Sequence, residues 1–318
     1  MIANPERSLR ITRDISTSSA EPEKTVDTNP EPGPEWPSAF KTWGKAWDLH
    51  IYLFAVLYVI MIATSVIGLV YDVLTNHGIK ALKLTLYLSL LFLGCSRAII
   101  MFADPYSSRG TLSFFCVYIT WSLGFPCVLT ALGLLLLVFA DVTKMDLAPP
   151  RFQKLSTALG VTVCNLVLVL ITDLLLLFTQ KGFILLIICH VYFLILGLIL
   201  TAGFLLVGFQ ISNNSAAAIY GDTGLSRLRV LAFITAALNL LFLGVHIYSV
   251  IEFGFGEIPR AWPWYAVQTS LRALEVSMCV VMFFIVFNNR VSFSVACLRN
   301  MIPNRFRNRV SPLRSAIP

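Results

Sequence analysis

Six charged or histidine residues lie at least five positions from either end of the long apolar runs of this sequence, and their side chains are the ones that could form a polar site. They are Arg97, Asp173, His190, His246, Arg272 and Glu275. Charged groups in a membrane span normally face the interior of a helix bundle and pair with one another. We expect Arg97 to pair with Asp173, and Arg272 to pair with Glu275 one helical turn away. Such a set predicts either a polar cavity for a small ligand or ion, or a closed network that fixes the packing of the helices.

The residue types do not fit three specific activities of membrane proteins, namely zinc hydrolysis, aspartyl proteolysis and retinal binding. A zinc hydrolase needs histidines at ligand spacing, whereas the four histidines here are never paired along a helix. An intramembrane aspartyl protease needs two deep aspartates, and only Asp173 is deep. A retinal Schiff base needs a lysine in the last span, where Arg272 stands instead. We therefore expect no enzymatic activity, no metal and no cofactor.

The elements that must position these side chains are transmembrane helices. Of the 318 residues, 57% are hydrophobic and 13% are charged, against about 25% charged residues in soluble domains. Seven apolar runs are each close to the roughly 20 residues that cross a bilayer. They are 50–74, 82–103, 112–140, 155–178, 183–209, 227–251 and 263–287. The sequence predicts an all-α, multi-pass integral membrane protein of the plasma membrane or an endomembrane, with a kink at Pro126 in the third span.

The distribution of basic residues predicts the orientation of the bundle. One set of flanks collects thirteen Lys and Arg residues, and the other set has five near the membrane. By the positive-inside rule the N-terminus is outside or lumenal and the C-terminus is cytoplasmic. This placement accounts for the net charge of +7 without nucleic acid binding. Tryptophans such as Trp43, Trp47, Trp262 and Trp264 are expected at the outer interface.

This topology places all six ionisable residues in the outer half of the bundle, roughly 7–18 Å below the outer boundary at 1.5 Å per residue. The inner half of the bundle has few comparable polar residues. Asn239 lies near the middle, and Asp141 lies at the cytoplasmic edge. Snorkelling to the outer interface is a further alternative for Arg97. A continuous conduction path would need polar groups through both halves of the bundle.

The two ends of the chain differ from the seven-helix domain, which we place at 46–290. Residues 1–45 are polar and rich in proline, and they predict a disordered tail without a signal-peptide core, so that the first span directs insertion. Residues 291–318 form a basic cytoplasmic tail that begins with a short amphipathic helix on the leaflet. Cys297 in this helix is a candidate for S-palmitoylation or a plain thiol, and the arginines beyond it are expected to contact anionic lipid.

Two classes of function remain after these exclusions. The first is a non-enzymatic seven-helix protein, receptor-like or scaffolding, whose ligand and protein partners the sequence does not name. The alternative is a transporter or channel for a small polar solute or ion. Hallmarks of the main class of G-protein-coupled receptors are missing, because the third span ends in Ala140-Asp141-Val142 and no Asn-Pro-x-x-Tyr closes the seventh.

Three short pieces of sequence resemble the seven-helix proline-rich transmembrane proteins, members 3 and 4. The first is WGKAWDLHIY at 43–52. The second is Ser96-Arg97-Ala98, followed by Asp104-Pro105-Tyr106. The third is WPWYAVQTSLRALE at 262–275. The resemblance covers about residues 36–300, and it implies a fold and a membrane location but no reaction.

Overall fold

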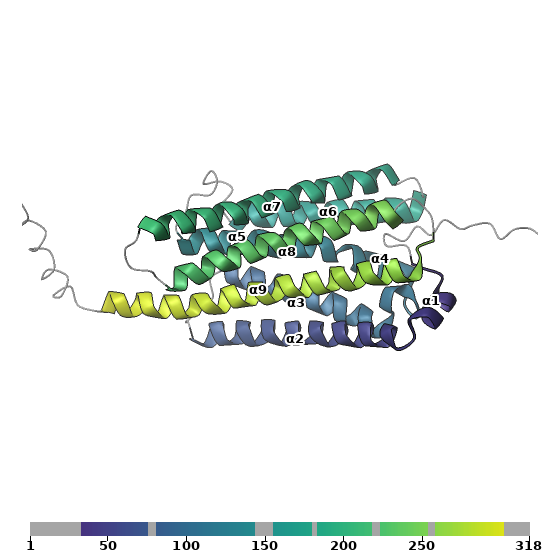
Figure 1. The fold of residues 1–318 in the computed structure, drawn as a ribbon, viewed down its shortest axis with the longest axis horizontal. Coiled ribbons are helices and arrows are strands. Elements are labelled where there is room, and N and C mark those ends of the chain that lie inside the picture. The colour runs from purple at the N-terminus through teal and green to yellow at the C-terminus, as the bar shows by residue number, and fades with distance from the viewer. Residues whose placement is uncertain are drawn as a thin grey trace, which may run out of the picture.

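The computed structural model describes residues 33–75, 81–143, 155–179, 183–217, 223–253 and 258–301. Helices run side by side along one long axis, with the small helix α1 at one end (Figure 1). We call this end of the bundle the α1 end and the other the opposite end. The helices are α1 (Trp36–Trp43), α2 (Lys45–Thr75), α3 (Ala81–Ala103), η1 (Pro105–Ser107), α4 (Phe114–Ser122), α5 (Gly124–Thr143), α6 (Leu155–Thr179), α7 (Phe183–Ala217), α8 (Thr223–Phe253) and α9 (Ala261–Met301).

Within the described residues, seven helical spans are long and apolar enough to cross a membrane, which confirms the predicted fold class. They are supplied by α2, α3, α4 with α5, α6, α7, α8 and α9. Large apolar side chains such as Ile60, Ile67 and Leu241 are exposed on the outside of the bundle, where a bilayer would cover them. The chain is therefore an integral, multi-pass membrane protein.

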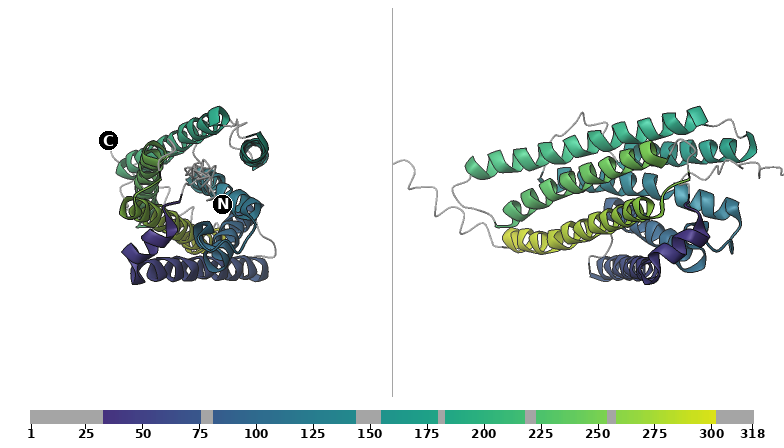
Figure 2. Two further views of the ribbon diagram at one scale, coloured as in Figure 1. Left: turned by 90° about the vertical axis from the view of Figure 1, so that its right-hand side faces the viewer. Right: turned by 45° about the vertical axis from the view of Figure 1, so that its right-hand side comes forward.

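The third span lies at the centre of the bundle and is the most buried of the seven. Its second half, α5, contacts α3, α6, α7 and α9, and the end-on view shows the other helices arranged around it (Figure 2). The span is divided into two helices at Leu123, three residues before Pro126. Proline lacks a backbone N–H and crowds the preceding turn, so the break lies where the predicted kink requires it.

Two predictions at the ends of the domain need correction. Residues 36–43 form α1 and pack on the bundle instead of belonging to a disordered tail; residues 1–32 lie outside the described part of the chain. Residues 291–301 are helical, but they continue α9 from the seventh span and do not form a separate helix. The side chain of Cys297 and all residues after Met301 lie outside what the structure describes.

Aromatic packing explains why the short helix α1 forms on the α1 end. We call its core the aromatic cap, and it consists of Trp36, Phe40, Trp43, Trp47, Tyr106 and Trp264. Their ring centroids lie 5.0–6.5 Å apart in successive contacts. Three of the tryptophans expected at the outer interface, Trp43, Trp47 and Trp264, pack within the cap and are at most 7% exposed, whereas Trp262 at the same end is 53% exposed. Their depth at the membrane interface stays a prediction.

Candidate functional site

Glu275 of α9 is the centre of a buried ion-pair network. Its Oε1 accepts a hydrogen bond from Nε of Arg97 at 3.2 Å. Its Oε2 accepts one from Nη1 of Arg272 and another from the hydroxyl of Tyr58 at 3.0 Å. All three ionic side chains are at most 4% exposed. The predicted Arg272–Glu275 pair is therefore present.

The predicted pairing of Arg97 with Asp173 is wrong, because Arg97 uses Glu275. Arg97 of α3 lies against Glu275 of α9 and the end of α4, whereas Asp173 lines the cavity from α6. Its Nη1 also donates to the backbone carbonyl of Trp121 at 3.3 Å. Arg97 is thus held between α9 and α4 within the protein, and it does not snorkel to a lipid interface.

The indole ring of Trp121 contacts both arginines of this network. The Cζ atoms of Arg97 and Arg272 lie 4.5 and 4.6 Å from the ring centroid. An aromatic face attracts a cation at this distance, more strongly where water is excluded. Trp121 therefore adds a cation–π contact to each of the two arginines that share Glu275.

Gly124, the first residue of α5, makes room for the Arg97 guanidinium. A Cβ atom at this position would meet Nη2, Cζ and Nε of Arg97 at 1.8, 2.3 and 2.9 Å. The break at Leu123 and the glycine after it allow the backbone of the third span to pass directly over the arginine.

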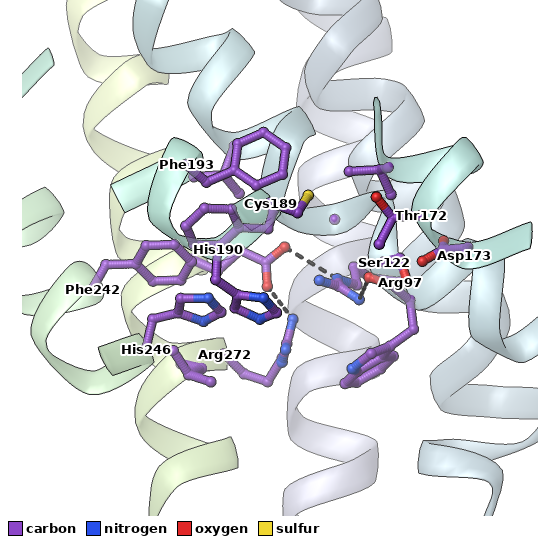
Figure 3. A pocket seen from close by; sticks show the side chains of 17 residues that line it. Arg97, Ser122, Thr172, Asp173, Cys189, His190, Phe193, Phe242, His246 and Arg272 are labelled. Atoms are coloured by element: carbon purple, nitrogen blue, oxygen red, sulfur yellow. Dashed lines mark hydrogen bonds and ion pairs between the residues drawn. The ribbon is translucent and has the colours of Figure 1, made fainter. Parts of the chain in front are cut away.

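All six residues singled out from the sequence line one cavity of about 90 Å³ (Figure 3). Arg97 reaches it from α3, Asp173 from α6, His190 from α7 and His246 from α8, while Arg272 and Glu275 reach it from α9. Most of them lie six or seven residues from the helix end nearest α1, which is about 9–10 Å at 1.5 Å per residue. The structure therefore gathers residues that are far apart in the sequence at one depth.

The two histidines form an aromatic wall of the cavity. Their rings stack with centroids 5.2 Å apart and planes 8° apart. The ring of Phe125 stacks on His246 at 4.4 Å and also contacts Phe193 and Phe242. Figure 3 shows the rings of His190, His246, Phe193 and Phe242 on one side of Arg97 and Asp173 on the other.

Asp173 lies beside Ser122 and Thr172 at the α6 side of the cavity (Figure 3). Ser122 hydrogen-bonds its side chain. The other carboxylate oxygen, Oδ2, is buried and has no hydrogen-bond partner among the described residues. With 3% of the side chain exposed, this is a buried acid without a cation beside it in the described part of the chain.

Several residues around the cavity escaped the sequence analysis. His50 is buried and bonds Thr269 through Nδ1 and the Tyr106 hydroxyl through Nε2, each at 2.9 Å. Tyr106 has a positive φ of 56°, and its ring packs within the aromatic cap against Trp47 and Trp264. The nearest sequence signal was the Asp104-Pro105-Tyr106 loop, which marks a tight turn but does not show what the tyrosine contacts.

Asp104 holds this loop together. It is fully buried, and its two carboxylate oxygens accept backbone hydrogen bonds from Arg109, Thr111 and Leu112 at 2.8–3.1 Å. Asp72 is a further buried acid that the sequence analysis missed. It lies near the opposite end of α2 and accepts a hydrogen bond from Tyr87 at 3.2 Å.

A family model described as the proline-rich transmembrane protein 3 domain matches residues 19–302. Comparison with curated proteins and with solved structures gave no significant match. The matched range includes every helix described above, and it agrees with the resemblance carried by the three sequence pieces. The chain therefore belongs to the proline-rich transmembrane protein 3 domain family.

Proposed function

We propose that the chain is a non-enzymatic, receptor-like membrane protein whose cavity at the α1 end takes a small polar ligand. The observation that carries this proposal is the convergence of six ionisable side chains from five helices on one cavity. A network that served packing alone would fill the space between its members. Here a volume of about 90 Å³ remains between the Glu275 network, the histidine wall and Asp173.

Packing beyond the cavity favours this proposal over a transporter or channel. Towards the opposite end the interior is occupied by Leu132, Leu135 and Phe139 of α5, with Phe204 and Met282 from the neighbouring helices, each at most 1% exposed. The amide of Asn239 lies at this level, but it donates to Gly197 and Thr201 of α7 at 2.8–2.9 Å. These contacts describe an apolar plug, whereas conduction needs polar groups along the whole path.

Accessibility of the cavity from each side of the membrane tests the proposal. Ser122 lines the cavity and is half-buried, so Ser122→Cys is introduced into a chain whose seven native cysteines are replaced by alanine. A membrane-impermeant thiosulfonate is then added to one side or the other of sealed vesicles. Leu135→Cys, in the apolar plug, is the matched control.

We expect Ser122→Cys to react only from the side that the α1 end faces, and Leu135→Cys to react from neither side. Reaction of Ser122→Cys from both sides would indicate a continuous path and would support transport instead. If Ser122→Cys reacts from neither side, the polar residues form a closed structural network, and the proposal is overturned.

A further inference from the structure

The charges around the cavity are separated into two unequal groups. Glu275 is shared by Arg97 and Arg272, so this network carries one positive charge in excess. Asp173 lies across Ser122 from the network and, when ionised, carries one negative charge. Their charges balance, but the structure shows no ion pair between them among the described residues. In a site of low dielectric, both groups favour a partner of opposite charge.

Two hydrogen-bond donors on the positive side of the cavity have no acceptor among the described residues. Arg97 uses Nε and Nη1, while Nη2 makes no hydrogen bond to a described residue. The indole N–H of Trp121 is buried and likewise has no acceptor in the described ranges. A guanidinium recognises a carboxylate through charge-assisted N–H···O hydrogen bonds, and the indole ring of Trp121 lies 4.5 Å from Cζ of Arg97.

The negative side offers an acceptor in the same way. Oδ2 of Asp173 is buried and without a partner among the described residues, and both Asp173 and its neighbour Ser122 line the cavity. A carboxylate in this state binds a protonated amine, which supplies both a charge and a donor. An anion alone would leave Asp173 without a counter-charge, and a cation alone would leave the excess arginine charge.

We infer that the ligand of this cavity is a small zwitterion of the amino-acid class, with its carboxylate at Arg97 and Trp121 and its ammonium at Asp173. This inference rests on the proposed function. A volume of about 90 Å³ is about three times the roughly 30 Å³ that one water molecule occupies in the liquid. The stacked rings of Phe125, His190 and His246 close one wall, so an amino acid with a short or absent side chain fits, and a bulky one does not.

Binding of defined probes to the full chain in lipid nanodiscs tests this inference. Glycine, β-alanine and γ-aminobutyrate are the zwitterionic probes, acetate and methylamine carry one charge each, and tryptophan is too large. We expect at least one small zwitterion to bind at least about tenfold more tightly than acetate or methylamine, because two charged hydrogen-bonded contacts replace one. Tryptophan should not bind.

Asp173→Asn is the diagnostic variant, and Asp72→Asn is its matched control, since Asp72 is equally buried but lies near the opposite end. Asp173→Asn should weaken zwitterion binding at least about tenfold and leave acetate binding unchanged, while Asp72→Asn changes neither. Unfolding midpoints of both variants show that the comparison is made on folded protein.

The outcomes separate this inference from the proposed function. If acetate or methylamine binds as tightly as the best zwitterion, and Ser122→Cys labelling shows an open cavity, the proposed function stands and the zwitterion inference falls. Equal weakening by Asp173→Asn and Asp72→Asn would also overturn the inference. If no probe binds and the cavity is closed to labelling, both fail.

Discussion

A Cβ atom on Gly124 would lie 1.8 Å from Nη2 of Arg97, so glycine is required where the third span crosses the arginine. Arg97 cannot move aside freely, because Nε is bonded to Glu275 and Nη1 to the carbonyl of Trp121. The position of a charge in α3 thus depends on the absence of a side chain in α5.

Gly124→Ala should therefore displace the guanidinium and break part of the Glu275 network. We expect the free energy of unfolding to fall by about 1–3 kcal/mol, as for other overpacked sites, measured by thermal unfolding in detergent. Gly160→Ala is the matched control, because a Cβ on Gly160 of α6 meets nothing within 4 Å. Equal effects of the two substitutions would show that Arg97 is not held against Gly124.

Glu275→Gln should destabilise the protein more than Arg97→Gln. The first change leaves two buried guanidinium groups without their carboxylate, at a cost of about 3–5 kcal/mol. The second leaves Glu275 bonded to Arg272 and Tyr58 and costs about 1–3 kcal/mol.

A double-mutant cycle tests this ranking. The variant with both Arg97→Gln and Glu275→Gln should recover part of the loss seen in Glu275→Gln, because one excess charge is removed. The charge exchange Arg97→Asp with Asp173→Arg should not recover stability relative to the single substitutions. Strict additivity of the two single changes would contradict the shared role of Glu275.

Asp104→Ala should loosen the loop between α3 and α4. The carboxylate holds the backbone N–H groups of Arg109, Thr111 and Leu112, and their loss exposes the Arg109–Gly110 bond to trypsin. We expect faster cleavage after Arg109, followed by mass spectrometry of the fragments, while Asp48→Ala, an exposed aspartate at the same end, leaves the rate unchanged. Identical rates would show that the loop is held by other contacts.

The orientation of the bundle is the prediction from the positive-inside rule. Single cysteines at Lys41 and Arg305 should react with an impermeant maleimide on intact cells at position 41 only, and at position 305 only after permeabilisation. The reverse pattern would place the α1 end and its cavity on the cytoplasmic side.

Acylation of Cys297 is a separate prediction. Acyl-exchange labelling of the wild-type chain should give a signal that Cys297→Ser removes, whereas Cys116→Ser, which removes an exposed cysteine at the α1 end, leaves it unchanged. A wild-type chain without any label would rule out the anchor.

The sequence was sufficient for the seven spans and for the common depth of the ionisable residues. Both follow from length and hydropathy along the chain, and Arg97, Asp173 and His246 indeed reach one cavity. The partner of Arg97 could not be predicted in this way. It depends on how far α3 is rotated towards α9, and depth contains no information on rotation.

The structural features that the sequence did not reveal depend on contacts with residues far away along the chain. The eight residues of α1 include Pro37 and are too short a segment to form a stable helix alone. Their stability comes from contacts with rings of α2 and α9. His50 appeared isolated because its partners, Tyr106 and Thr269, lie 56 and 219 positions away. Such contacts become visible only when the first and last spans are placed side by side.

That adjacency has a consequence for biosynthesis. Tyr58 and Arg97 are separated from Glu275 by 217 and 178 positions, so a ribosome must complete five further spans before the carboxylate reaches the arginine. During that time Arg97 sits in a newly inserted helix without its counter-ion, at a cost that translocation and membrane chaperones must tolerate. Chains that terminate before α9 never acquire the carboxylate, so Arg97 stays buried without its counter-ion in an unfinished product.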